Sequence, residues 1–318
     1  MKITEFGKRF QSEQDCEDYL RKAREDNGVV CKKCGCERHY WNKDKKCWVC
    51  KECRHETSLT ADTVIHGSKL SLLTWFTTIH LLTTTKNSFS ASEMQRQLGL
   101  KRYQPVWEML HKIRSVMGLR DDKYELNETI ELDECFITAE NSDSEVKDEK
   151  PKRGTGSQRK QKVLVMVESK ECTPKKKTDK PRKMNHIKMK VLDNLKADTV
   201  NKTVKGSVSP DTTAVVDASK SHVLLEKVVQ KVDKKVVPGK DAPKVLPWVH
   251  ISIANAKSRF QNLYHGIKDK YLQEYLNEFC WQLNRRFMHE LTFDRLIAAS
   301  ISYQSEFKHQ IYNSKLIR

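Results

Sequence analysis

Four cysteines near the start of the chain have the spacing of a metal site. Cys31 and Cys34 form one C-x-x-C pair, Cys50 and Cys53 form a second, and fifteen residues separate the pairs. This spacing is typical of zinc, because each C-x-x-C turn presents two thiolates to one ion and Zn²⁺ prefers four ligands in a tetrahedron. Four protein ligands leave no open position, so we expect a structural ion that stabilises a segment too short to fold alone.

Two further cysteines leave alternatives open within this segment. Cys47 forms a competing C-x-x-C pair with Cys50, which shortens the gap to twelve residues, and Cys36 is also nearby. Disulfides are disfavoured, because paired C-x-x-C spacings in a reducing compartment more often bind metal. Reduced cysteines packed in a core are a weak alternative, because lysines surround them.

Two aspartates within predicted strands form a second candidate site. Asp133 lies inside an apolar stretch and Asp217 ends another. A carboxylate among apolar strand residues is costly unless it is paired or binds a cation, so two of them in one sheet suggest a shared metal ion. Glu134 follows Asp133, but consecutive strand residues point to opposite faces, and we choose Asp133. The alternative places both aspartates in solvent at strand ends or edges.

A third metal ligand is expected from the helical region after Pro247. Asn255 offers a carbonyl oxygen, which hard cations accept. Glu274 and Glu278 are the other candidates; they share one helix face at i, i+4, and their simplest role is a solvated surface.

A helix-turn-helix is predicted within residues 70–120. Ser90 is a plausible N-cap with Glu93 three residues later, and Gly99 breaks the pattern into two helices. In a DNA-binding helix-turn-helix the second helix is the recognition helix, and its first residues contact bases and phosphates. An ordinary helical hairpin that buries Trp107 would have the same pattern. The candidate DNA-binding residues at this start are Lys101, Arg102, Tyr103 and Gln104.

The elements that must position these sites follow from hydrophobic patterning. A short helix is expected before the cysteines, and helices follow Pro247. We expect an α/β fold in three parts: residues 1–60 with the cysteines, 61–122 with the helix-turn-helix, and 123–318 with the acidic site. Predicted strands cover 128–137, 163–167, 186–192 and 212–218.

Two hydrophilic stretches, 140–162 and 171–183, interrupt the predicted strands and are expected to be exposed loops. Their lysines, including Lys175, Lys176 and Lys177, are placed to follow a phosphate backbone. If they do so, binding should weaken steeply with salt.

The composition favours a polyanionic partner. The 318 residues include 59 Lys plus Arg and 42 Asp plus Glu, which gives a formal charge of +17. Nucleic acid is a better candidate than an acidic membrane surface, although a solvated basic face is the simplest interpretation. No apolar run reaches the roughly 18 residues that span a bilayer, and residues 1–10 lack the apolar core of a secretion signal. We therefore expect a cytoplasmic protein with no membrane partner.

Several stretches occur together in a characteristic order between about residues 30 and 297. They are CKKCG with CKECR, SLTADTVIHGSKLSLLTWF, SASEMQRQLGL with VWEMLHKIR, IELDECFI, KRGTGSQRKQKVLVMV, VVDASKSH, and HISIANAKSRFQNLYHG with YLNEFCWQLNRRF. This series resembles the insertion-sequence transposases of the IS1595 type. The resemblance implies a zinc ribbon, a helix-turn-helix region and an RNase H-like DDE/N catalytic domain with a mixed sheet flanked by helices.

The resemblance also implies roles for individual residues. Asp133 and Asp217 correspond to the first two catalytic positions and Asn255 to the third, with Lys257 as the accompanying lysine. The three ligands would hold Mg²⁺ or Mn²⁺ for two-metal phosphoryl transfer. The implied partners are double-stranded DNA, as terminal inverted repeats and as target, and further copies of the chain.

Three departures from the family pattern bear on activity. Residues 135–139 replace the usual aromatic residue and glycines, 216–218 read Val-Asp-Ala instead of Thr-Asp-Gly, and 282–286 read QLNRR. None removes a ligand. Together, however, they admit a decayed, inactive copy. Two alternatives to an active transposase remain: a non-catalytic zinc-ribbon and helix-turn-helix DNA-binding protein derived from a transposase, and a general RNase H-like nuclease.

Overall fold

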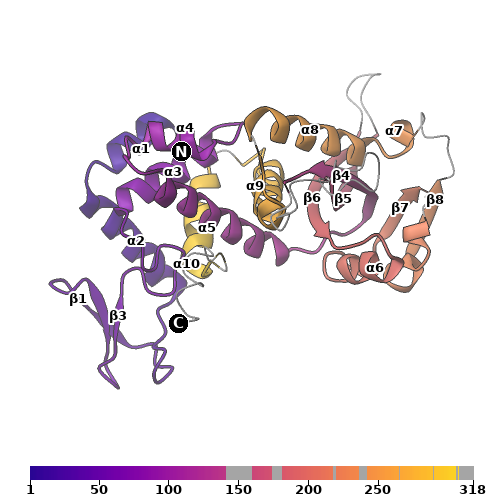
Figure 1. The fold of residues 1–318 in the computed structure, drawn as a ribbon. Coiled ribbons are helices and arrows are strands. Elements are labelled where there is room, and N and C mark those ends of the chain that lie inside the picture. Colours follow the sequence, from indigo (N-terminus) through magenta and orange to yellow (C-terminus); the bar gives the residue numbers. More distant parts are fainter. Residues whose placement is uncertain are drawn as a thin grey trace, which may run out of the picture. The chain divides into compact units, whose positions relative to one another are not determined.

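The computed structural model describes residues 1–140, 160–173, 181–217, 220–235, 242–264, 266–288, 290–305 and 307. The chain forms two compact units (Figure 1), one of residues 1–120 with 285–318 and one of residues 121–284. Contacts thus group residues 285–318 with the first unit, whereas residues 123–318 were predicted to form one domain. Most of the two predicted loops lies outside the described residues.

The second unit contains a five-stranded mixed sheet. The strand order is β6-β5-β4-β7-β8, with β5 antiparallel to both neighbours and β7 parallel to both neighbours. In chain order the strands lie 3-2-1-4-5, which is the RNase H-like arrangement and confirms the expected fold. The strands are β4 (Thr129–Thr138), β5 (Lys160–Glu171), β6 (Arg182–Leu192), β7 (Thr213–Asp217) and β8 (Lys231–Lys235).

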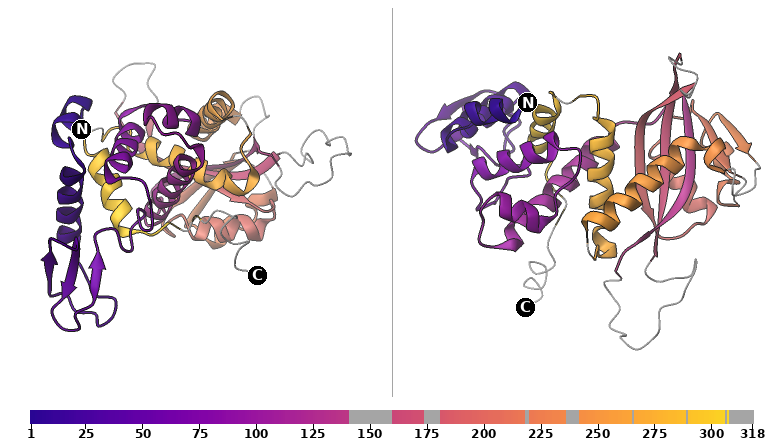
Figure 2. Two further views of the ribbon diagram at one scale, coloured as in Figure 1. Left: turned by 60° about the vertical axis from the view of Figure 1, so that its left-hand side comes forward. Right: turned by 90° about the horizontal axis from the view of Figure 1, so that it is seen from above.

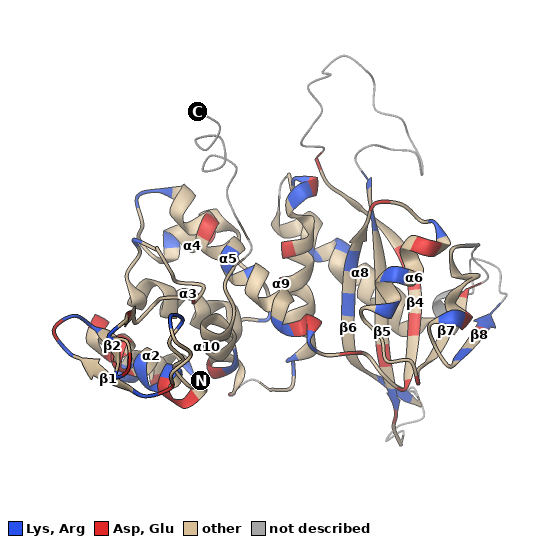
Figure 3. Cartoon of the chain, turned by 90° about the horizontal axis from the view of Figure 1, so that it is seen from below, with Lys and Arg blue, Asp and Glu red and all other residues tan. Residues whose placement is uncertain are grey.

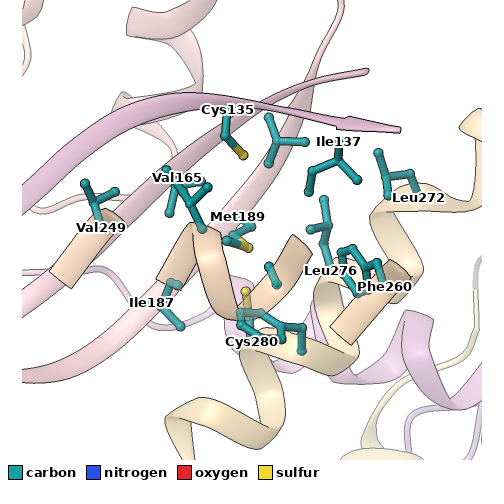
Figure 4. Packing of buried hydrophobic residues seen from close by; sticks show 14 of the residues in the cluster. Cys135, Ile137, Val165, Ile187, Met189, Val249, Phe260, Leu272, Leu276 and Cys280 are labelled. Atoms are coloured by element: carbon teal, nitrogen blue, oxygen red, sulfur yellow. The ribbon is translucent and has the colours of Figure 1, made fainter. Parts of the chain in front are cut away.

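Helices cover both faces of this sheet. On β5, Val163, Val165 and Val167 face one core, while Leu164 and Met166 face the other, so this strand is buried on both sides as predicted. Helices α8 (Pro247–Leu263) and α9 (Leu272–Asn284) close the first core, which Figure 4 shows, and α6 (Ala197–Lys205) closes the second (Figure 1). The remaining elements are α7 (Ala242–Val245) and the 3-10 turns η2 (Lys220–His222), η3 (Leu225–Lys227) and η4 (Asp269–Tyr271).

The edge strand β6 is protected by amide side chains of α9. Asn284 accepts from the backbone N–H of Ile187 at 2.8 Å and donates to the carbonyl of the same residue at 3.1 Å. Gln273 accepts from Val191 N–H at 2.9 Å and donates to the Met189 carbonyl at 3.0 Å. The two amides thus satisfy edge groups that would otherwise be open to another strand.

The first unit is helical and carries a small sheet at its N-terminal side. Ser90 caps α4, because its Oγ accepts the Glu93 N–H at 3.1 Å, and Gly99 adopts φ +63° in the turn that follows. Its elements are α1 (Ile3–Arg9), α2 (Glu13–Asn27), β1 (His39–Asn42), β2 (Cys47–Cys50), β3 (Glu56–Ser58), α3 (Leu72–Thr84), α4 (Ala91–Gln97), α5 (Tyr103–Asp122) and α10 (Thr292–Ser302).

The small sheet packs at the end of α2 (Figure 2). Strands β1, β2 and β3 form an antiparallel meander in which Trp41 pairs with Trp48. The guanidinium of Arg24 lies 4.8 Å from the Trp48 ring centre, and Trp48 Nε1 donates to Glu25 Oε1 at 3.2 Å. These contacts join the sheet to α2.

A search of the described ranges finds no helix with both the length and the apolar character needed to cross a membrane.

Candidate functional site

The structure brings together the four cysteines selected by their spacing. The Sγ atoms of Cys31, Cys34, Cys50 and Cys53 all lie within 4.8 Å of one another. The Cys31–Cys53 and Cys34–Cys50 pairs are both 3.5 Å apart. A tetrahedral site with 2.3 Å bonds needs sulfurs about 3.8 Å apart, so the cluster fits Zn²⁺ with little adjustment.

The backbone of the two turns shapes the cysteine cluster and favours the thiolate of Cys50. Gly35 and Arg54 each follow a C-x-x-C pair, and both adopt positive φ, +70° and +59°. Backbone N–H groups of Cys53 and Glu52 lower the pKa of Cys50 to about 6 against the opposing effect of burial. A thiolate stabilised in this way is the form that binds zinc.

The two remaining cysteines of the segment lie outside this group of four. Cys36 Sγ accepts the Arg38 N–H at 3.3 Å. Cys47 is buried on β2, paired with Asn42 and Ser58. Among the described residues, the 31/34/50/53 set is therefore the one whose geometry suits four-sulfur coordination.

Asp133 and Asp217 come from adjacent parallel strands. The register pairs Leu132 with Val216, which places the two aspartates next to each other at the following position. Burial raises the pKa of Asp133 to about 6, and the negative charge of Asp217 adds to the rise. Two carboxylates in mutual repulsion form an oxygen donor set that a hard divalent cation would stabilise. The residues present therefore fit Mg²⁺ or Mn²⁺.

Two residues that were not predicted connect helix α8 to the aspartates: one lies on β4 and the other on α8. Glu131, on the same face of β4 as Asp133, accepts the N–H groups of Trp248 at 2.7 Å and Val249 at 2.9 Å. His250 follows, and its Nε2 lies 3.8 Å from Asp133 Oδ2. Burial lowers the pKa of His250 against the opposing charge of Asp217. The period-two spacing of Glu131 and Asp133 was the available sequence signal.

The two predicted residues of α8, Lys257 and Asn255, lie on different sides of the helix. Burial raises the pKa of Cys135 to about 12, and the positive charge of Lys257 acts against this rise, so Lys257 lies near β4. Asn255 is exposed, and five helical residues turn it about 140° from His250. The structure thus brings Asp133, Asp217 and His250 together, with Lys257 beside the strand, and Asn255 lies on a different side of the helix.

The opposite face of β4 carries a second polar group. His222, in η2, lies with Nε2 3.0 Å from Glu134 Oε1 and Nδ1 3.1 Å from Asp217 Oδ1. Burial acts to lower the pKa of His222, but the hydrogen bond and charge of Glu134, with the charge of Asp217, raise it overall. Burial likewise acts to raise the pKa of Glu134, and His222 reverses this effect. Glu134 was excluded by the alternation of strand faces, and His222 was not among the predicted site residues.

The predicted DNA-binding residues of the first unit are at the surface. Lys101, Arg102 and Gln104 are all exposed at the start of α5. Trp107 and His111 of the same helix lie with ring centres 4.2 Å apart in a tilted arrangement, and His111 and Leu110 are buried, so α5 also packs in the interior. Lys and Arg occur in both units, including β6 (Figure 3). Lys175, Lys176 and Lys177 lie outside the described residues.

Comparison with solved structures gives distant likenesses. The Mos1 transposase paired-end complex with left transposon end is 13% identical, covering 72% of this chain and 79% of that one with a TM-score of 0.28. A pre-cleavage Mos1 transpososome is 11% identical, covering 74% and 80% with a TM-score of 0.24. No curated protein matches the chain.

Comparison with protein families gives two matches. Residues 11–56 match the transposase zinc-ribbon domain, which together with the four-cysteine cluster supports structural zinc. Residues 125–284 match the ISXO2-like transposase domain, and this range covers half of the chain and includes Asp133 and Asp217. The protein therefore belongs to the family of transposases with an ISXO2-like domain, of the IS1595 type.

Proposed function

We propose that this protein is a DNA transposase that binds the terminal inverted repeats of its insertion sequence and catalyses strand cleavage and strand transfer. The observation that carries the proposal is the adjacency of Asp133 and Asp217 on neighbouring strands of a transposase domain. Without a cation, a pair of carboxylates this close has no evident structural purpose, because the two negative charges repel each other.

The two aspartates would hold Mg²⁺ or Mn²⁺. When bound, these ions activate the attacking water or 3′-hydroxyl and stabilise the leaving oxygen. Asp133 is well suited to the task because it is fixed within a strand and accepts the Glu134 N–H at 2.8 Å. Asn255 is proposed as the third ligand on the strength of the resemblance alone. Lys257 is proposed to offset phosphate charge or to position the strand.

The first unit would supply DNA binding. Lys101 and Arg102, which are exposed, would neutralise phosphates, and exposed Gln104 would reach base edges, as expected of a recognition helix. Lys175, Lys176 and Lys177 would add backbone contacts. Two transposon ends must be held during transfer, so we propose a homo-oligomer in the DNA complex that acts in the cytoplasm.

The test is cleavage and joining of duplexes that carry the terminal repeats, with Mg²⁺ present. Asp133→Asn and Asp217→Asn should each reduce both reactions to background while binding persists. Asp198→Asn, an exposed carboxylate on α6, is the matched control and should react like the unmodified protein. Unchanged rates in both site variants would refute the assignment. Binding without any cleavage would favour the non-catalytic alternative, and cleavage regardless of end sequence would favour the nuclease.

A further inference from the structure

Asp217 differs from Asp133 in how firmly its strand holds it. Asp133 lies in the middle of β4, whereas Asp217 is the last residue of β7 and its side chain is 42% exposed. A carboxylate at a strand end has rotamer freedom that metal binding must remove. A group that fixes the Asp217 carboxylate before metal arrives would therefore favour metal binding.

His222 is in the position to do so. Its side chain is only 1% exposed, and its Nδ1 makes an ion-pair contact of 3.1 Å with Asp217 Oδ1, although the angle is not that of a hydrogen bond. The two ring nitrogens project from opposite edges of the imidazole, so one ring can contact carboxylates on both sides. The second carboxylate is Glu134, 3.0 Å from Nε2.

This arrangement gives Glu134 a structural role, which is to anchor His222. It follows Asp133 directly, so its side chain points to the opposite face of β4 and is removed from the aspartate pair. Its side chain is 10% exposed, and Ser221, the neighbour of His222, also hydrogen-bonds to it. Ser221 and His222 of η2 thus both contact Glu134 on β4, the central strand of the sheet.

We infer that His222 is a positioning residue that, anchored by Glu134, holds the Asp217 carboxylate ready for a divalent metal ion. The inference rests on the proposed function, because it assumes that Asp217 is a ligand. Groups that orient metal ligands typically change metal affinity by about 10–100-fold when removed. His222 thus connects a carboxylate on one face of the central strand to the metal site on the other.

The test measures Mn²⁺ binding to the zinc-loaded, full-length protein without DNA, by electron paramagnetic resonance of the free ion. His222→Phe keeps an aromatic ring but loses both contacts, and should weaken Mn²⁺ binding by about 10–100-fold. His186→Phe is the matched control, because His186 Nδ1 lies 3.6 Å from Glu168 on the same sheet but away from Asp217. Its Mn²⁺ affinity should stay within about twofold of the unmodified protein.

A second variant keeps the test decisive if His222→Phe folds poorly. Glu134→Gln preserves side-chain size and should weaken Mn²⁺ binding by about tenfold, at the lower end of the range. If Glu134 acts through His222, the double variant should bind no more weakly than His222→Phe alone. Circular dichroism spectra establish that each variant is folded.

The outcomes separate this inference from the proposed function. Loss of Mn²⁺ in Asp217→Asn together with normal affinity in folded His222→Phe and Glu134→Gln would overturn the inference and leave the function intact. Equal Mn²⁺ binding by the unmodified protein, Asp133→Asn and Asp217→Asn would instead overturn the proposed function.

Discussion

Glu131 on the central strand receives the backbone N–H of Trp248 at 2.7 Å, and through this bond β4 holds the first turn of α8. The first N–H groups of any helix lack partners within the helix, and a carboxylate satisfies them while stabilising the positive end of the helix dipole. Leu246, the N-cap residue of α8, makes no side-chain cap of its own. The carboxylate two residues before Asp133 therefore positions the helix that carries His250.

Replacing Glu131 by alanine should destabilise the second unit. The change leaves the N–H groups of Trp248 and Val249 without their acceptor in a buried setting, which costs about 2–4 kcal/mol. Urea unfolding followed by tryptophan fluorescence measures the loss. Glu171→Ala is the control, because Glu171 is 88% exposed and pairs with Arg182 at 3.2 Å, and exposed pairs contribute about 0–1 kcal/mol. Similar losses in the two variants would contradict this account of α8.

Zinc content should distinguish the four clustered cysteines from their two neighbours. Cys53→Ser removes one of the four close sulfurs and should lose zinc, since structural zinc binding contributes about 10–16 kcal/mol through a complete ligand set. Cys36→Ser and Cys47→Ser should retain it. Metal analysis after dialysis, together with the far-ultraviolet spectrum before and after chelator, checks both statements. Zinc loss in Cys36→Ser with retention in Cys53→Ser would reverse the assignment.

Sequence patterns predicted those features that depend on interactions between residues close together in the chain. The cysteine spacing selected the observed cluster because two turns of fixed geometry determine where four sulfurs can meet. The predicted strand 128–137 differs from β4 by a single residue at each end, because its apolar positions are buried on both faces. Ser90 was recognised as a cap because its bond to Glu93 spans only three residues.

Contacts between distant segments could not be predicted in this way. Strand β8 has the sequence KVDKK and no apolar alternation; it forms by pairing with β7, and charged residues are usual on an edge strand. His222 can contact both Glu134 and Asp217 only when β4 and β7 are paired. Asn284 gave no sequence signal for its bonds to Ile187, which lies 97 residues away.

DNA binding should lose salt dependence when a phosphate contact is removed from α5. Lys101 is exposed next to the start of this helix. If it neutralises one phosphate, Lys101→Ala should reduce the slope of log K against log salt concentration by about 0.9. Fluorescence anisotropy with a terminal-repeat duplex at several salt concentrations measures this slope. Lys8→Ala, an exposed lysine on α1, is the control and should keep the original slope; equal slopes in all three proteins would place Lys101 away from DNA.

His80 should make the first unit less stable in acid. The side chain is 2% exposed, stacks on Phe6 at 4.3 Å, and its ring nitrogens have no hydrogen-bond partner among the described residues. Burial lowers the pKa of His80 in the folded protein, so the unfolded chain binds the proton first, near its ordinary value of about 6.5. The stability that neutral His80 contributes is therefore fully present above about pH 6.5 and is lost as the pH falls.

Thermal unfolding between pH 8 and pH 5 tests this dependence through the change in Tm. His80→Leu should show a smaller fall in Tm on acidification than the unmodified protein, because a leucine has no proton to gain. His66→Gln replaces an exposed histidine of the same unit and should keep the original fall. Carboxylates and zinc thiolates titrate equally in all three proteins, so the difference between the variants isolates His80. An identical fall in His80→Leu would show that the buried imidazole does not contribute to acid sensitivity.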